Sequence, residues 1–492
     1  MQARMRAAPR TNIRALLRGI PAAAWICALV ALLNGVAWSI ITPPFQGRDE
    51  PSHFAYVQQL AETGTLPHEV AEGGGPSPRE NKAIEGLHQY EIMLAPEVPA
   101  ISSVSEQRAL KNDLSEELSP VGSGEAGVAT SEPPLYYALE IVPYALGAGN
   151  TLTQLQLMRL AGAVLAALTT LLAFFFLREL LPGSPWMTTI ATGCIAVQPL
   201  FGFMSGTLNP DTMLYTVSAA VLLCLARAFR RGLSMRLSIA LGAAIAIGLV
   251  TKLNFIGLCA GIFLGLSLIG IREVRSHGRE ALKPIGAATG IGLSPVLLYA
   301  VFSGGSLFSS IGDVITFNNG GFFKEVSYAW QLYLPRLPGM SHYFPGIETY
   351  REIWFDRFVG LYGWLDTQFP TWVDNLALIP AGLIAVLCLR TLVVGRERLR
   401  SRLPEIATYA LLLIGLLVMV GHSAFSSYLS SGAAAFGDPR YLLPVLPLLA
   451  AILVLAIRGA GRWAPPVAAV ILVTFLAHDL FSQMQTIARY YG

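Results

Sequence analysis

Long apolar stretches alternate with shorter polar ones along almost the whole chain. A helix needs about 20 mostly apolar residues to cross a hydrocarbon core of about 30 Å. Stretches near this length occupy residues 22–42, 154–177, 186–207, 212–229, 237–251, 254–271, 285–302, 375–395, 405–422, 441–458 and 464–482. The pattern predicts an all-α polytopic membrane protein with about eleven transmembrane helices, whose ends are placed to about four residues.

The composition supports the same class. Of the 492 residues, 53% are hydrophobic and 13% are charged, which is about half the charged share of a soluble protein. The start carries five arginines and no acid before the first apolar run. That run is too long for a signal-peptide core and lacks a small-residue cleavage site. We therefore expect a basic cytoplasmic N-terminus, residues 1–21, and a single transmembrane domain, residues 22–492.

The basic residues set the orientation. With the start inside, the predicted cytoplasmic segments lie near 178–185, 230–236, 272–284, 396–404 and 459–463. Together with the start and their flanks they hold 21 of the 34 Lys and Arg residues, as the positive-inside rule requires. Two segments on the other face, 43–153 and 303–374, are too long to be simple connectors. Loops of this size usually carry function, so we expect the chemistry on the outer face.

Several soluble activities have no sequence support. The sequence has no Gly-rich phosphate loop with a following helix, no zinc-type spacing and no internal repeat. The inner loops are short and basic, and their small size argues against a cytoplasmic catalytic domain. We expect no nucleic acid as a partner.

A polar cluster follows the first apolar stretch. The sequence Arg48-Asp49-Glu50 is followed by His53 and by a helical pattern that ends near Gly64. The pattern resembles a helix lying along the membrane surface. Asp49 is a candidate helix cap. It is also a candidate carboxylate that accepts a proton from a hydroxyl above the bilayer.

A second short apolar segment opens with Glu132-Pro133-Pro134-Leu135-Tyr136-Tyr137 and ends near Gly147. Its length of about 14 residues is too short to cross, so we expect it to lie in the interface. Arg159 is predicted near the outer end of the following span. The stretch 69–130, rich in Gly, Pro, Ser and Glu, is predicted to be a mobile loop.

These motifs resemble those of a known superfamily. Asp49-Glu50-Pro51-Ser52-His53-Phe54 and Pro133-Pro134-Leu135-Tyr136-Tyr137 look like the first-loop motifs of GT-C membrane glycosyltransferases. More closely, the chain resembles a widespread family of bacterial membrane proteins of unassigned function with the GT-C layout. That similarity extends to Asn209-Pro210-Asp211, Gly363-Trp364-Leu365-Asp366-Thr367 and Arg440-Tyr441-Leu442-Leu443-Pro444, in order across about 80% of the chain.

The resemblance implies a transferase that uses a polyprenyl-phosphate sugar as donor. By motif position the carboxylate that acts as, or positions, the catalytic base is Asp49, with Glu50 as the alternative and Asp211 as a second outer acid. Lys252 and Arg440 are then expected to bind the donor phosphate. The remaining motif residues are assigned to substrate binding: His53, Tyr136, Arg159, Trp364 and Asp366. The chain departs from better-known members in lacking an obvious soluble C-terminal domain, which leaves the acceptor open.

Each of these residues also has a structural interpretation. Lys252 lies in a very short turn between two apolar spans and is either a snorkelling lysine or a phosphate ligand. Asp211 is a candidate cap of the next helix. Arg440 is a candidate partner of Asp438 or a phosphate ligand. The second long loop holds half of the eight tryptophans, which suits either an interfacial belt or stacking on sugar rings.

The function predicted from the sequence is an inverting glycosyltransferase in a bacterial inner membrane, acting on its periplasmic or extracellular face. Its partners are a polyprenyl-phosphate sugar donor, a cell-envelope glycan or lipid acceptor, and membrane lipids. No cofactor is obligatory, and a divalent metal is allowed. The alternatives are a transporter or flippase of lipid-linked saccharides, and a polysaccharide polymerase or ligase. A transporter usually carries inverted repeats, which this sequence does not show.

Overall fold

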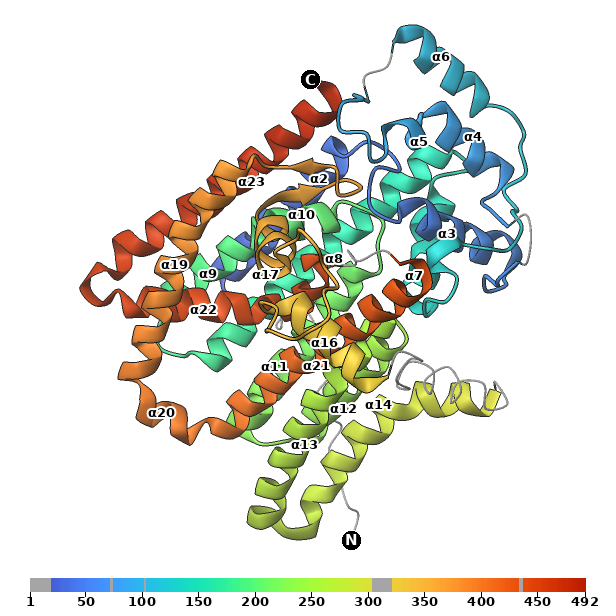
Figure 1. Ribbon diagram of the computed structural model, residues 1–492. Coiled ribbons are helices and arrows are strands. Elements are labelled where there is room, and N and C mark those ends of the chain that lie inside the picture. The colour runs from blue at the N-terminus through green and yellow to red at the C-terminus, as the bar shows by residue number, and fades with distance from the viewer. Residues whose placement is uncertain (1–18, 71–73, 101–102, 303–320, 433–436) are drawn as a thin grey trace.

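The computed structural model describes residues 19–70, 74–100, 103–302, 321–432 and 437–492. Helices dominate the described chain, and its strands form one two-stranded antiparallel hairpin, β1 (Leu361–Tyr362) and β2 (Thr367–Gln368) (Figure 1). The chain is an all-α multi-pass membrane protein, which confirms the predicted fold class. Residues 1–18 and 303–320, which belong to the predicted N-terminus and second outer loop, lie outside the described residues.

All eleven predicted spans fall on helices. These helices are α2 (Ala22–Ile41), α8 (Thr151–Leu180), α9 (Pro185–Ala196) with α10 (Pro199–Ser205), α11 (Asp211–Arg231), α12 (Met235–Leu249), α13 (Ile256–His277), α14 (Leu282–Phe302), α19 (Thr371–Val394), α21 (Leu403–Ser431), α22 (Leu446–Gly459) and α23 (Ala464–Tyr491). By length and apolarity, eight segments of the described chain can cross a membrane, or nine if the bent pair α9 and α10 forms one span.

Three features explain why eight or nine segments meet this test although the sequence predicted eleven spans. The candidate segment 253–298 contains two helices, α13 and α14, joined by a 3₁₀ turn, η3 (Gly278–Ala281). Helix α12 has only 15 residues and at 1.5 Å per residue is about 22 Å long, so it is too short to cross alone. The axes of α9 and α10 are bent by 58° where Pro199, which lacks an amide hydrogen, opens the second helix.

The predicted cytoplasmic loops lie together at one end of the bundle. Arg230 and Arg402 both donate hydrogen bonds to the carbonyl oxygen of Leu180, and Arg458 donates to those of Leu181 and Pro182. These cations stabilise the free carbonyls and the negative dipole at the end of α8. The loop helices on this side are α20 (Arg396–Ser401) and η6 (Gly461–Trp463). The contacts agree with the alternation of loops that the hydrophobic pattern predicts.

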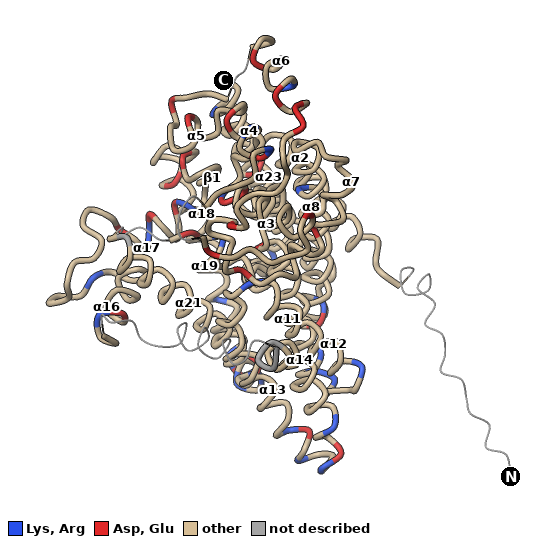
Figure 2. The backbone as a smooth tube through the Cα atoms, turned by 90° about the vertical axis from the view of Figure 1, so that its right-hand side faces the viewer, with Lys and Arg blue, Asp and Glu red and all other residues tan. Residues whose placement is uncertain are grey.

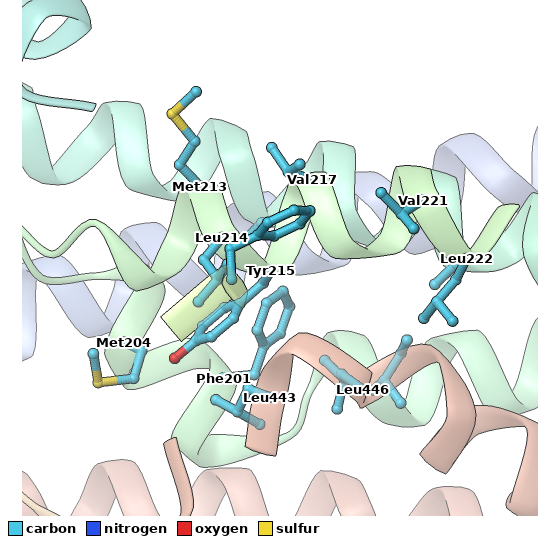
Figure 3. Close-up of a cluster of buried hydrophobic side chains, with 14 of the residues drawn as sticks. Phe201, Met204, Met213, Leu214, Tyr215, Val217, Val221, Leu222, Leu443 and Leu446 are labelled. Atoms are coloured by element: carbon cyan, nitrogen blue, oxygen red, sulfur yellow. The ribbon is translucent and has the colours of Figure 1, made fainter. Parts of the chain in front are cut away.

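Helix α11 lies at the centre of the bundle and is its most deeply buried span. Its apolar side chains pack against α8 and α12 and against the 3₁₀ segment η5 (Pro439–Val445). Figure 3 shows Tyr215 of α11 beside Phe201 of α10 and Leu443 of η5. The hydroxyl of Tyr215 donates a hydrogen bond to the carbonyl oxygen of Arg440. The core therefore fixes the backbone of a predicted site residue.

The two long loops gather at the opposite end of the bundle. The first loop forms α3 (Glu50–Thr63), α4 (Pro78–Gly86), α5 (Gln89–Ile92), α6 (Val104–Asp113), η1 (Gly127–Ala129) and α7 (Leu135–Leu146). The described part of the second forms α16 (Phe322–Tyr333), α17 (Thr349–Arg351), a π-helical turn η4 (Glu352–Asp356), α18 (Arg357–Gly360) and the β hairpin. In Figure 1, α4 to α6 lie near the C-terminal end of α23. Figure 2 shows charged residues concentrated there and at the turn between α13 and α14.

The structure tests three local predictions for the first loop. Helix α3 ends at Gly64 with positive φ, as predicted, and α7, with 12 residues, is too short to cross. The prediction of a mobile stretch over 69–130 is wrong for its described residues, because α4, α5 and α6 form there. Serine N-caps start α4 and α6, and Arg489 of α23 donates hydrogen bonds to three carbonyls of the connecting segment. Local capping and this long-range contact order the stretch despite its polar composition.

Candidate functional site

A cavity of about 450 Å³ lies where the first loop meets the bundle. Its walls come from segments far apart in the sequence, and its charged members are three cations and three carboxylates. The lining residues are Arg48, Asp49, His53, Val128, Glu132, Lys252, Asn254, Leu365, Val420, Ser423, Gly437, Asp438, Arg440 and Tyr441. Of the ten predicted site residues, four lie in this wall: Asp49, His53, Lys252 and Arg440.

Asp49 lies between α2 and α3 and faces the cavity. Its φ of +60° is a left-handed conformation that Asp adopts more readily than most residues. The predicted side-chain cap is absent, because the carboxylate makes no cap hydrogen bond to α3. It instead accepts a hydrogen bond of 2.8 Å from Nη2 of Arg440, and 24% of the side chain is exposed.

The charge state of Asp49 follows from this contact. Burial alone would raise its pKa, but the positive charges of Arg440 and Arg48 outweigh burial and lower the pKa to about 2. His53 contributes little at neutral pH, since burial lowers the pKa of its own ring to about 3. Asp49 is therefore a carboxylate, and His53 a neutral imidazole, throughout the physiological range.

Glu50, the alternative acid, points away from the cavity. It is fully buried and forms a bidentate ion pair with Arg159 of α8, at 2.7 Å to Nε and 2.6 Å to Nη2. Arg159 also donates hydrogen bonds to three carbonyl oxygens at the end of α2, those of Ser39, Thr42 and Pro43. This pair joins the last turn of α2 to the first turn of α3. It thereby fixes the backbone that carries Asp49.

Arg440 lies at the start of η5 and is surrounded by acids. Its Nε is 3.1 Å from Asp438 and 3.8 Å from Asp211, and its Nη2 is bound to Asp49. Asp438 also forms an ion pair with Arg48. The predicted pairing of Arg440 with Asp438 is therefore present, within a larger network. Nη1 of Arg440 is buried and makes no hydrogen bond to the described part of the chain.

Lys252 occupies the turn between α12 and the 3₁₀ helix η2 (Leu253–Phe255). Its ammonium group is 2.9 Å from Asp211 and 3.7 Å from Glu132, and only 7% of its side chain is exposed. A snorkelling lysine would reach solvent, whereas this one is buried. Burial alone would lower the pKa of Lys252, but Asp211 and Glu132 raise it, so it is charged. Asp211, expected as a helix cap, opens α11 and lies just behind the wall.

The tyrosines of the second first-loop motif have different positions. Tyr137 shares a hydrogen bond of 3.0 Å with Nδ1 of His53 and stacks on Tyr56 at 3.7 Å between ring centroids. Tyr136 is fully buried beneath it and does not line the cavity. The motif thus supports the wall from behind and fixes the His53 ring.

The motif Gly363-Trp364-Leu365-Asp366 forms the turn of the β hairpin. Leu365, with a φ of +66°, lines the cavity. The indole N–H of Trp364 donates a hydrogen bond to the carbonyl oxygen of Phe45, and Asp366 forms an ion pair of 3.0 Å with Arg489. Trp364 and Asp366 therefore position the turn and do not reach into the cavity.

Three charged wall residues are absent from the predicted site: Arg48, Glu132 and Asp438. Each opens a motif that the sequence analysis recognised or lies within two positions of one. The sequence signal that identifies these residues is a local cluster of charges beside an apolar stretch. Charges at the edge of a membrane helix are energetically costly unless they pair. In the described chain, no group of three or more His, Cys, Asp or Glu side chains is arranged to hold a metal ion.

A second, smaller cavity of about 150 Å³ lies between α12, α13 and α14. It is lined mostly by apolar side chains: Ile245, Leu249, Ile256, Cys259, Ile262, Phe263, Leu266, Ala288, Thr289, Gly292, Leu293 and Val296. Leu249 and Ile256 flank the turn that carries Lys252. The apolar cavity is therefore lined in part by residues that are close in sequence to Lys252 of the charged cavity. The rest of its lining comes from predicted membrane spans.

Comparison with known proteins gives a family and two distant structural likenesses. A family model described as "Predicted membrane protein (DUF2142)" matches residues 32–449, and no curated protein matches the sequence. The structure is similar to ArnT from Cupriavidus metallidurans bound to undecaprenyl phosphate and to the oligosaccharyltransferase of Archaeoglobus fulgidus, both of the GT-C fold. Each is 13% identical, with TM-scores of 0.41 and 0.45. The matches cover 95% of this chain, 76% of ArnT and 53% of the archaeal protein, so the chain spans about half of the latter.

Proposed function

We propose that this chain, which belongs to the membrane protein family DUF2142, is an integral membrane glycosyltransferase. It moves a sugar from a polyprenyl phosphate to a hydroxyl of a cell-envelope acceptor. The observation that carries the proposal is the cavity in which Asp49, Lys252 and Arg440 meet at the end of the bundle. A carboxylate beside two buried cations suits the transfer of a group from a phosphate to a hydroxyl.

The donor phosphate binds between Lys252 and Arg440. The Lys252 ammonium is buried, and Nη1 of Arg440 has no hydrogen-bond partner among the described residues. Together they supply the charge and the hydrogen bonds that a phosphate oxygen requires. Asp211 holds the Lys252 ammonium group from behind. The polyprenyl chain extends from there into the apolar cavity between α12, α13 and α14, so the donor enters sideways from the membrane.

Asp49 accepts the proton of the acceptor hydroxyl. The acceptor oxygen attacks the anomeric carbon, the bond from that carbon to the phosphate oxygen breaks, and the configuration inverts. A carboxylate with a low pKa is a weak base in the ground state, but the acceptor oxygen becomes acidic as it bonds to carbon. Asp49 is sufficient for this late proton transfer. Glu50 and Arg159 position Asp49. His53 lines the wall that faces the substrates, while Tyr136, Trp364 and Asp366 support that wall from behind.

We place the cavity on the periplasmic or extracellular face of a bacterial inner membrane. The basis is the basic composition of the loops at the opposite end of the bundle. A lipid-linked donor and a cell-envelope acceptor are both accessible from that face.

Sugar transfer in proteoliposomes tests the proposal. Purified protein is incubated with radiolabelled polyprenyl-phosphate sugars and a cell-envelope extract, and the label is followed into a new covalent product. Transfer of a single sugar is the expected result. Movement of an unaltered donor across the bilayer would instead identify a flippase, and transfer of preassembled oligosaccharide would identify a polymerase or ligase.

The variant Lys252→Gln is expected to raise the donor KM by about 10- to 100-fold, since a hydrogen bond to a charged group contributes about 1.5–3 kcal/mol. Lys252→Arg keeps the charge and should lose less. The matched control is Lys111→Gln, at an exposed position in α6. Gel filtration in detergent identifies variants that misfold because Asp211 has lost its partner. An unchanged KM in a folded Lys252→Gln protein would remove Lys252 from the donor site.

A further inference from the structure

Glu132 is a residue of the cavity wall that has no role in the proposed mechanism. It precedes α7 and lines the charged cavity. Its Oε1 is 3.7 Å from the Lys252 ammonium group, and its carboxyl group accepts a hydrogen bond from the backbone N–H of Leu253. Its Oε2 is buried and has no hydrogen-bond partner in the described chain. One oxygen is thus fixed, and the other is left for a hydrogen bond to a ligand.

Glu132 and Asp49 share one cavity but have opposite environments. Asp49 is bound directly to Arg440 and is held ionised. Burial raises the pKa of Glu132, and the nearby Asp211 adds to this effect, while Lys252 lowers it only in part. Two carboxyl groups in one site whose environments favour opposite protonation states are the usual arrangement for a base and an acid.

The net charge of the cavity also favours an ionised Asp49 and a protonated Glu132. Its walls hold Asp49, Glu132 and Asp438 with Arg48, Lys252 and Arg440, and Asp211 lies directly behind Lys252. With every acid ionised, these residues have one more negative than positive charge, before the anionic donor arrives. Protonation of Glu132 makes the set neutral. A bound phosphate adds a negative charge and favours the protonated form of Glu132 further.

We propose that Glu132 is the general acid of the transfer and protonates the phosphate oxygen that leaves the anomeric carbon. This inference rests on the proposed function. The acceptor O–H proton goes to Asp49, the new bond forms between the acceptor oxygen and the anomeric carbon, and the old bond to the phosphate oxygen breaks. That oxygen takes the proton of Glu132. The two carboxyl groups have then exchanged protonation states, and solvent restores them.

Other titratable groups close to Glu132 could produce the same pH dependence of kcat if they lost a proton in the same pH range. The groups that face Glu132 are the Lys252 ammonium group, the Leu253 amide and the Asp211 carboxylate, with the hydroxyls of Tyr56 and Tyr137 behind. Burial raises the pKa of both tyrosines, and Lys252 is likewise charged far above neutrality. Asp49 titrates near pH 2. Glu132 is therefore the group of this set whose loss of a proton can produce an alkaline limb, because burial raises its pKa above its ordinary value, while Asp49 is already ionised and Lys252 and the tyrosines keep their protons.

The first test is the pH dependence of kcat with a polyprenyl-phosphate sugar donor. In the wild type, kcat should fall on the alkaline side with loss of one proton. Glu132→Gln should lower kcat at the optimum by about 100-fold or more and abolish the alkaline limb, whereas Glu132→Asp should retain the limb. Glu69→Gln, at an exposed position of the same loop, should match the wild type.

A positioning role alone predicts a different pattern. If Glu132 only held Lys252 in place, Glu132→Gln would raise the donor KM and leave kcat and its alkaline limb unchanged. That result, or normal activity of a folded Glu132→Gln protein, overturns the assignment of Glu132 as the acid.

The second test needs no turnover. Methyl farnesyl phosphate is a diester with one fixed negative charge, like the donor. Calorimetric titration near pH 8 in buffers of different ionisation enthalpy measures the protons taken up when it binds. Uptake by the wild type and its loss in Glu132→Gln supports protonation of Glu132 beside the phosphate. Binding with equal uptake in both proteins, or with none, overturns it. Binding and uptake without sugar transfer from any donor would refute the proposed function but keep the protonation.

Discussion

Replacing Asp49 by Asn is expected to lower kcat for sugar transfer by about 1,000-fold, within the range of about 10²- to 10⁴-fold for loss of a general acid–base group. Asn has the shape of Asp and also tolerates positive φ, so the backbone at +60° is preserved. What is lost is the charge that accepts the acceptor proton. The measurement is single-turnover transfer from a radiolabelled polyprenyl-phosphate sugar by detergent-purified protein.

The donor KM separates this role from an electrostatic one. Asp49 is bound to Arg440, so its neutralisation frees a cation and should leave donor binding equal or tighter. A large fall in kcat with an equal or lower KM is therefore the signature of a base. The control variant Glu62→Gln changes an exposed acid on the same helix, α3, and should have little effect. Transfer at the wild-type rate by a folded Asp49→Asn protein would exclude Asp49 from the chemistry.

The fold was predictable because the membrane imposes a simple length rule. Apolar runs long enough to cross a bilayer are recognised directly from hydropathy. The basic loops between them show which loops lie on the cytoplasmic face. The same rule fails where a helix ends early. Helix α12 stops at Leu249, and the chain then turns and carries Lys252 into the cavity wall. Hydropathy alone does not show that the helix before this turn is too short to cross the membrane.

The site was predictable only in part, because sequence spacing does not show which charges meet. Asp49 and Glu50 are adjacent and chemically alike, yet one faces the cavity and the other is fully buried against Arg159. The partners lie far apart in the sequence. Arg159 pairs with Glu50 across 109 positions, and Arg440 reaches Asp49 across 391. Glu132 was visible as the first residue of a motif, but its free oxygen depends on the fold of the α12–η2 turn.

The second large expected effect concerns stability. Glu50 and Arg159 are both buried and paired, with side-chain exposures of 0% and 2%. Removing one charge leaves the other uncompensated inside the protein, which costs about 3–5 kcal/mol. Glu50→Gln is therefore expected to destabilise the protein by about this amount. Unfolding by sodium dodecyl sulfate in mixed micelles, followed by near-ultraviolet circular dichroism, measures the change.

The double variant decides why the single one is unstable. Glu50→Leu with Arg159→Leu removes both charges and should recover part of the loss. Recovery will be incomplete, because the three carbonyl oxygens at the end of α2 lose the hydrogen bonds from Arg159 and remain buried. If Glu50 were instead the catalytic acid, Glu50→Gln would unfold at the wild-type detergent fraction and lose only kcat. A destabilised protein with partial rescue in the double variant would assign Glu50 to the support of Asp49 and leave the chemistry to the residues of the cavity wall.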